Sequence, residues 1–175
     1  MLTRDEEDYL SKIPDDEVVK ICPFNPNIGK IVKKIITSIH DVYPNLEIRH
    51  TGASALGVSG QKDIDIYAFS NPKGFKEYLP GLTGILGKHL HKHQTFMEWK
   101  FEKEGYDIEF YLADPNSKTM KRQIKVFEIL KNDKKLLKEY EELKRSLDGK
   151  SFKEYQKKKY EFYHRLLDSK KSSKR

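Results

Sequence analysis

A chain of 175 residues, with 37% hydrophobic and 35% charged residues, is long enough to bury a core, and its composition argues against disorder except at the ends. No apolar run reaches the roughly 20 residues that a membrane helix needs, and the acidic run Asp5–Asp8 is unlike the basic start of a signal peptide. The single cysteine, Cys22, excludes an internal disulfide, so we expect a cytoplasmic protein with no membrane partner.

The formal net charge of +7 is unevenly distributed along the chain. Residues 118–175 hold 20 Lys and Arg against 9 Asp and Glu, a net charge of +11, whereas the 14 basic and 18 acidic residues before them give −4. Such a basic segment attracts polyanions such as nucleoside triphosphates or RNA, although lysine-rich amphipathic helices are more often simply solvated. Nucleic acid is therefore a candidate partner of helices over residues 118–168.

The N-terminal part of the chain predicts an arm, a helix and a strand. The arm contains a short helix over residues 6–13 and an extended stretch over 18–21. Apolar residues at three- and four-residue steps predict an amphipathic helix over 28–42, which ends before Pro44. Alternating apolar and polar residues over 46–50 predict a half-buried strand.

The middle of the chain predicts further strands around an interrupted stretch. Residues 63–69 form an apolar run that contains two acids and predicts a strand. Prolines and glycines interrupt a helical pattern over 71–87, which indicates broken or short helices. Residues 96–101 and 106–112 predict a hairpin with Gly105 in its turn.

Helices alone are expected after residue 117. Three segments, over 118–131, 133–147 and 151–168, have helical patterns, with a break at Gly149. The fold class is therefore α+β. We expect one structural domain, formed by a core over 1–117 with its N-terminal arm and a basic helical segment over 118–168 packed on it, and a flexible tail over 169–175.

The most informative residues are the carboxylates of two predicted strands. Asp63 and Asp65 share one face of a strand, and Asp107 and Glu109 share one face of another, because strand side chains alternate. Adjacent negative charges repel, and a divalent cation such as Mg²⁺ would neutralise them. Should the strands be neighbours, Asp63, Asp65 and Glu109 would converge as metal ligands. Asp107 is the alternative third acid, less firmly held because it lies next to the turn.

A plainer interpretation of these acids stays open. In an antiparallel strand with one solvated face, Asp63, Asp65, Asp107 and Glu109 would be ordinary exposed residues. The spacing Asp-x-Asp is a weak signal alone. It gains weight from the small-residue turn Gly52-Ala53-Ser54, which lies about ten residues upstream.

The combined pattern resembles the polymerase-β-type nucleotidyltransferase superfamily, at Gly52, Ser54, Asp63, Asp65 and Glu109. More narrowly, the chain resembles the GrpB-like family over roughly residues 17–167. The motifs that carry this narrower resemblance are Val19–Pro26, His50–Leu56, Phe127–Leu130, Lys138–Lys144, Tyr155, Lys159 and Phe162. The resemblance implies a small mixed, twisted sheet of the nucleotidyltransferase type, covered by helices.

The resemblance also implies an activity. Asp63, Asp65 and Glu109 would be the catalytic residues and would hold two Mg²⁺ ions, for which Mn²⁺ can substitute. A nucleoside triphosphate would be the substrate, and its nucleoside monophosphate would pass to an unidentified hydroxyl acceptor with release of pyrophosphate.

The same resemblance assigns the phosphates to the turn. Backbone N–H groups of Gly52, Ala53 and Ser54 would hold the β- and γ-phosphates, and Lys62 would add a phosphate contact. Serine usually follows the glycine directly, whereas here Ala53 does and Ser54 comes one residue later.

Two other classes of function remain open. The chain could be a non-catalytic module that binds a nucleotide or RNA, or an antitoxin-like partner that docks on another protein through its C-terminal helices. His89, His91 and His93 could bind a transition metal on a strand, but such loop histidines often have no ligand. We expect His50 to bond a backbone group and Trp99 to belong to the core.

Overall fold

A computed structural model describes residues 2–172 of the chain, and these residues form two units. The sheet unit comprises Phe24–Val58 and Lys62–Lys121. The helical unit comprises the described residues up to Pro23, the segment Ser59–Gln61 and the described residues from Arg122 onward. The expected packing of the helices over 118–168 on a core over 1–117 stays a prediction.

The sheet unit is built on a mixed sheet of five strands, which confirms the α+β class. Their order is β1-β2-β5-β4-β3, and β2 pairs with β5 in parallel while the other neighbours are antiparallel. The predicted hairpin is confirmed, with Glu104 and Gly105 at positive φ in its turn. The strands are β1 (Glu47–Thr51), β2 (Asp63–Phe69), β3 (His91–Lys92), β4 (Phe96–Lys103) and β5 (Tyr106–Ala113).

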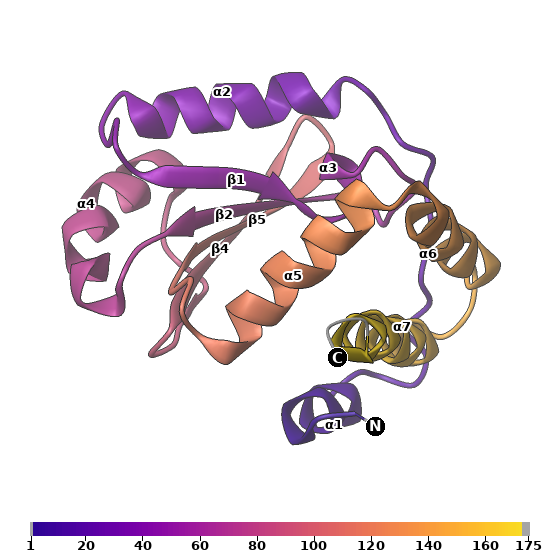
Figure 1. The fold of residues 1–175 in the computed structure, drawn as a ribbon. Coiled ribbons are helices and arrows are strands. Elements are labelled where there is room, and N and C mark those ends of the chain that lie inside the picture. Colours follow the sequence, from indigo (N-terminus) through magenta and orange to yellow (C-terminus); the bar gives the residue numbers. More distant parts are fainter. Residues whose placement is uncertain (1, 173–175) are drawn as a thin grey trace. The chain divides into compact units, whose positions relative to one another are not determined.

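One face of this sheet carries the apolar core of the unit. The inward residues of β2, β4 and β5 are fully or almost fully buried there together with one side of α2 (Ile28–His40) and of α4 (Phe75–Leu86). Figure 1 shows α2 running along the sheet near β1, and α4 beside the start of β1 and the end of β2. Trp99 lies in this core, and its indole N–H donates to the Gly87 carbonyl at 3.0 Å. The predicted helix over 28–42 is confirmed in its main part.

The stretch over 71–87 is more continuous than we expected. A single 3₁₀ turn, η1 (Pro72–Gly74), leads into α4, which continues through Pro80. Proline lacks an N–H and disturbs the preceding helical turn. The Tyr43 hydroxyl compensates, because it accepts from the Gly81 N–H at 3.0 Å and donates to the Glu77 carbonyl at 3.2 Å. A tertiary contact therefore supports a helix that the local sequence argues against.

The helical unit contains α1 (Arg4–Ser11), α6 (Lys134–Ser146), α7 (Phe152–Ser172) and most of α5 (Lys118–Asn132), which begins in the sheet unit. Figure 1 shows α1 beside α7. Capping side chains define two helix starts: Thr3 and Glu6 form a capping box on α1, and Asp133 caps α6.

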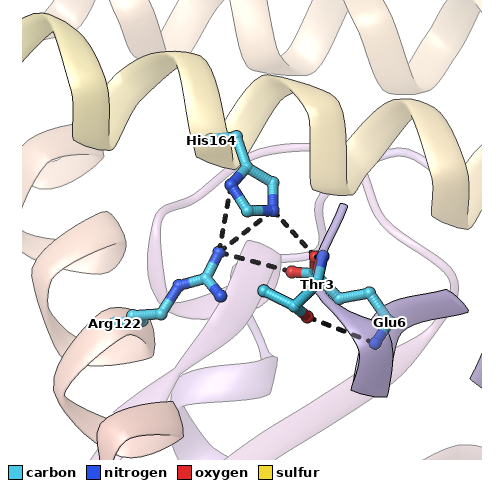
Figure 2. Close-up of polar contacts among 4 residues, drawn as sticks. All are labelled: Thr3, Glu6, Arg122 and His164. Atoms are coloured by element: carbon cyan, nitrogen blue, oxygen red, sulfur yellow. Dashed lines mark hydrogen bonds and ion pairs between the residues drawn. The ribbon is translucent and has the colours of Figure 1, made fainter. Parts of the chain in front are cut away.

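A polar cluster joins residues from both ends of the chain within the helical unit. The Glu6 carboxylate lies 2.7 Å from Nε2 of His164 and 3.3 Å from the Arg122 guanidinium (Figure 2). Burial alone would raise the pKa of Glu6, but hydrogen bonds from the Thr3 backbone, His164 and the Thr3 hydroxyl lower it below its ordinary value. The cluster therefore anchors α1 to α5 and α7.

The last helix extends further than the sequence predicted. It runs to Ser172, so residues 169–172 of the expected tail are helical, and residues 173–175 lie outside the described residues. Within residues 2–172, every helix is too short or too polar to cross a bilayer.

Candidate functional site

The four acids of the two predicted strands lie on the face of the sheet opposite the core, which we call the carboxylate face. β2 and β5 are parallel neighbours, as the predicted convergence required, and Asp63 is paired with Asp107 and Asp65 with Glu109. Ile64, between the two aspartates, is fully buried on the other face. Paired positions on adjacent strands lie about 5 Å apart, so the sheet places the two acids of β2 side by side with the two acids of β5.

Glu109 has partners that we did not predict. Its Oε1 accepts from Nζ of Lys100 at 2.9 Å, and its Oε2 accepts from the Tyr111 hydroxyl at 3.2 Å. That hydroxyl also lies 3.0 Å from Oε1 of Glu98. The hydrogen bond with Glu109 raises the pKa of Lys100, and burial raises that of Tyr111, so both groups stay protonated at neutral pH.

The sequence did contain a signal for the Lys100 contact. In an antiparallel hairpin, pairs follow outward from the turn, and Lys103 is paired with Tyr106 on either side of Gly105. Counting three further residues along each strand places Lys100 opposite Glu109. The predicted site comprised acids of β2 and β5 alone, whereas Lys100 lies on β4, the other neighbour of β5 in the sheet.

The glycine turn packs against one of these acids. Gly52 opens the short helix α3 (Gly52–Ala55) with φ +73°, a conformation that favours glycine. A Cβ on Gly52 would overlap the Asp65 carboxylate, whose Cγ lies 3.0 Å from the position of that Cβ. The Thr51 hydroxyl donates to the Asp65 carbonyl at 3.4 Å. Gly52 and Asp65 are thus in direct contact.

The side chains of His50, in β1, and Ser54, in α3, are hydrogen-bonded to each other across the glycine turn. Nε2 of His50 lies 2.8 Å from Oγ of Ser54, so His50 bonds a side chain where we expected a backbone group. Burial lowers the pKa of His50 to about 4, and the ring is therefore neutral at pH 7. The Ser54 hydroxyl is held by this ring.

Lys62 lies between the turn and the first acid of β2. Its φ is +70°, its carbonyl accepts from the Asp107 N–H at 3.3 Å, and its ammonium lies 5.8 Å from the centre of the Tyr106 ring. The structure therefore places Lys62 beside the turn of the β4–β5 hairpin. A phosphate contact from Lys62 stays a prediction.

The three histidines of the His-x-His-x-His pattern have separate surroundings. His89 packs edge-on against Trp99, and His93 stacks on Phe96. His91 lies 3.9 Å from a Glu98 carboxylate oxygen. Nothing in this geometry indicates a shared metal ion among the described residues.

Comparison with known proteins identifies the family. The family described as GrpB protein matches residues 18–169, which is most of the chain. The chain belongs to the GrpB family. The resemblance that the sequence motifs carried is thereby confirmed. No curated protein matches this member of the GrpB family.

Solved structures similar to this GrpB-family chain include the Cid1 poly(U) polymerase with MgGTP bound, at a TM-score of 0.42 and 9% identity over 81% of this chain. They also include a cytoplasmic RNA terminal U-transferase, at a TM-score of 0.41 and 12% identity over 81% of this chain. This chain covers 48% and 46% of those two proteins, so it spans about half their length.

The donors of this GrpB-family chain suit Mg²⁺ in chemistry but are not arranged as an assembled metal centre. Carboxylate oxygens are the hard ligands that Mg²⁺ prefers, and Asp63 and Asp65 are neighbours on one strand face. Within residues 2–172, however, no group of three or more His, Cys, Asp or Glu side chains has a metal-binding geometry. Glu109 is engaged by Lys100 and Tyr111.

Proposed function

We propose that this protein is a Mg²⁺-dependent nucleotidyltransferase, which moves a nucleoside monophosphate from a nucleoside triphosphate to a hydroxyl acceptor. The observation that supports this most directly is the parallel register of β2 and β5, which pairs Asp65 with Glu109. A second support is the contact between Gly52 and the Asp65 carboxylate. Acids on two strands and a small-residue turn then border the same point of the sheet.

Each residue has a role in this proposal. Asp63 and Asp65 would hold the metal, with Glu109 as the third ligand. A Mg²⁺ ion held by these residues, or Mn²⁺ in its place, would offset phosphate charge and lower the pKa of the acceptor hydroxyl. The acceptor oxygen would form a bond to the α-phosphorus, the bond to the bridging oxygen would break, pyrophosphate would leave, and the acceptor proton would pass to water near Glu109.

The turn would bind the rest of the triphosphate. Backbone N–H groups of Gly52, Ala53 and Ser54 would contact the β- and γ-phosphates, which small side chains allow to approach closely. Lys62, at the start of β2, would add a positive charge. His50 holds the Ser54 hydroxyl at 2.8 Å and so keeps α3 in place against β1.

The double variant D63N/D65N tests the function. Purified protein is incubated with each labelled nucleoside triphosphate, Mg²⁺ or Mn²⁺, and a mixture of small alcohols, protein and RNA acceptors, while label transfer and pyrophosphate are followed. We expect at least a 100-fold loss of transfer, with a thermal midpoint that is unchanged or higher because two like charges are removed.

E47Q is the matched control, because Glu47 belongs to the same sheet and is paired with Phe69, which is not a candidate site residue. It should retain transfer. A folded D63N/D65N protein with the activity of the wild type would contradict the assignment.

One observation favours a second candidate, a nucleotide-binding module without turnover. The ion pair with Lys100 engages Glu109, the proposed third ligand and the residue nearest the proposed transfer step. Such a module would be stabilised against heat by ATP or CTP in the presence of Mg²⁺ and would release no pyrophosphate. An antitoxin-like docking role of the C-terminal helices, which a pull-down without them would test, is a further alternative.

RNA is a candidate acceptor in the same proposal. The positive charge of residues 118–168 suits a polyanionic acceptor such as RNA. The RNA arm of the transfer assay covers this case. A cytoplasmic location also belongs to the proposal.

A further inference from the structure

Lys100 pairs with Glu109, the proposed third metal ligand. Its ammonium lies 2.9 Å from Oε1 of Glu109, on the carboxylate face. The other carboxylate oxygen accepts from the Tyr111 hydroxyl at 3.2 Å. Both oxygens of the proposed third ligand are therefore in use within the chain.

An ammonium and a divalent cation compete for the same carboxylate. Oε1 already accepts from Lys100, and two positive charges a few ångströms apart repel each other. Glu109 is therefore a weaker ligand for a metal ion while Lys100 is in place than it would be with the lysine side chain in water.

We propose that Lys100 is a resident cation that competes with a divalent metal ion for Glu109 and thereby sets the metal affinity of the carboxylate face. This rests on the proposed function in one respect, since it takes Asp63, Asp65 and Glu109 as the cation site. Asp63, Asp65 and Glu109 would favour metal binding in this proposal, and Lys100 would oppose it.

The ion pair between Lys100 and Glu109 is exposed enough for a metal ion to displace the lysine. The side chain of Lys100 is 47% exposed and that of Glu109 is 24% exposed. An ion pair with one partner half exposed is worth about a fivefold change in an equilibrium constant or less. The flexible lysine side chain can leave its partner and remain in water, so the competition is reversible.

Titration with Mn²⁺ alone tests the inference on the full chain, with free Mn²⁺ measured by its electron paramagnetic resonance signal. We expect K100M to bind Mn²⁺ roughly fivefold more tightly than the wild type. K100R keeps the charge and should stay within twofold of the wild type. Adding E109Q to K100M should remove the gain, because the released ligand is then absent.

K34M is the matched control, because it removes a lysine from another exposed ion pair of the sheet unit, Lys34 with Glu104 at 2.8 Å. It should leave Mn²⁺ affinity unchanged. K100Q replaces K100M if circular dichroism shows that K100M is not folded.

Three results would overturn the role of Lys100: an Mn²⁺ affinity in K100M that is unchanged or weaker, an equal gain in K34M, or a gain that survives E109Q. The two proposals fail separately. A tighter K100M in a protein that transfers no nucleotide supports the role of Lys100 and counts against the transfer reaction alone.

Discussion

At the scale of single residues, position 52 favours glycine for two reasons, its backbone conformation and its closeness to Asp65. Its φ of +73° is costly for a residue with a Cβ, and that Cβ would overlap the Asp65 carboxylate. Gly57 has a similar φ of +70°, but the nearest atom to its Cβ position belongs to Phe24 at 4.0 Å. Alanine at position 57 would therefore introduce backbone strain alone, whereas alanine at position 52 would add an overlap with Asp65.

We predict that G52A destabilises the protein more than G57A does. G57A should cost about 1 kcal/mol of unfolding free energy from backbone strain alone. G52A should cost a further 1–3 kcal/mol, roughly the usual cost of inserting a methyl group into packed surroundings. Urea denaturation at pH 7 measures both. Equal losses would mean that Asp65 moves aside without cost and that the close packing on Gly52 is unimportant.

At the scale of elements, α4 shows how a helix passes through a proline. The N–H of Gly81 and the carbonyl of Glu77 are the groups that normally bond each other across one helical turn. The Tyr43 hydroxyl stands between them, accepting from one and donating to the other. A side chain inserted into the helical ladder is a known cause of a bent but intact helix.

We predict that Y43F lowers the unfolding free energy by about 1–2 kcal/mol, because it leaves the Gly81 N–H and the Glu77 carbonyl without their partner. Y78F is the control, since the Tyr78 ring packs on Tyr43 at 5.1 Å but its hydroxyl has no hydrogen bond among the described residues. Urea denaturation should show little change for Y78F. A loss in Y78F as large as in Y43F would argue against the bridge.

At the scale of the whole molecule, the segment Ser59–Gln61 belongs to the helical unit while its neighbours in sequence belong to the sheet unit. Glu141 accepts from the Ser59 N–H at 3.0 Å and from its hydroxyl at 2.8 Å. The buried Lys144 ammonium donates to the Ser59 carbonyl. Within the helical unit, α6 thus holds Ser59 through both its backbone and its side chain.

The Glu6 cluster gives the helical unit a dependence on pH. Because its pKa in the folded protein is lowered from the ordinary 4.5, Glu6 stabilises the fold above that value and loses this contribution as the pH falls through the lowered pKa. Its carboxylate lies 3.3 Å from the Arg122 guanidinium and 2.7 Å from Nε2 of His164, and the side chain is only 13% exposed.

We predict that E6Q costs about 1–2 kcal/mol of unfolding free energy at pH 7 and less at pH 3, because acid protonates a growing share of Glu6 in the wild type. Urea denaturation at both pH values measures this. E7Q, at an exposed position of the same helix, is the control and should change neither value. A cost of E6Q that is equal at pH 7 and pH 3 would exclude a role of the carboxylate charge.

Local patterns predicted much of the sheet unit. Alternation identified β2 and β5, periodicity identified α2, and Gly105 identified the hairpin, because each depends on a few neighbouring residues. The continuity of α4 was not predictable in this way, since it depends on Tyr43, which lies far from Pro80 in sequence. The same holds for the bond between His50 and Ser54, which needs the turn to be folded.

The sequence by itself determined the membership in the GrpB family and which acids share a strand face, because motifs and alternation are properties of the order of residues. Only the tertiary structure decided that β2 and β5 are parallel neighbours and that Tyr43 supports α4 next to Pro80. Both depend on contacts between segments that lie far apart in the sequence, which local patterns do not encode.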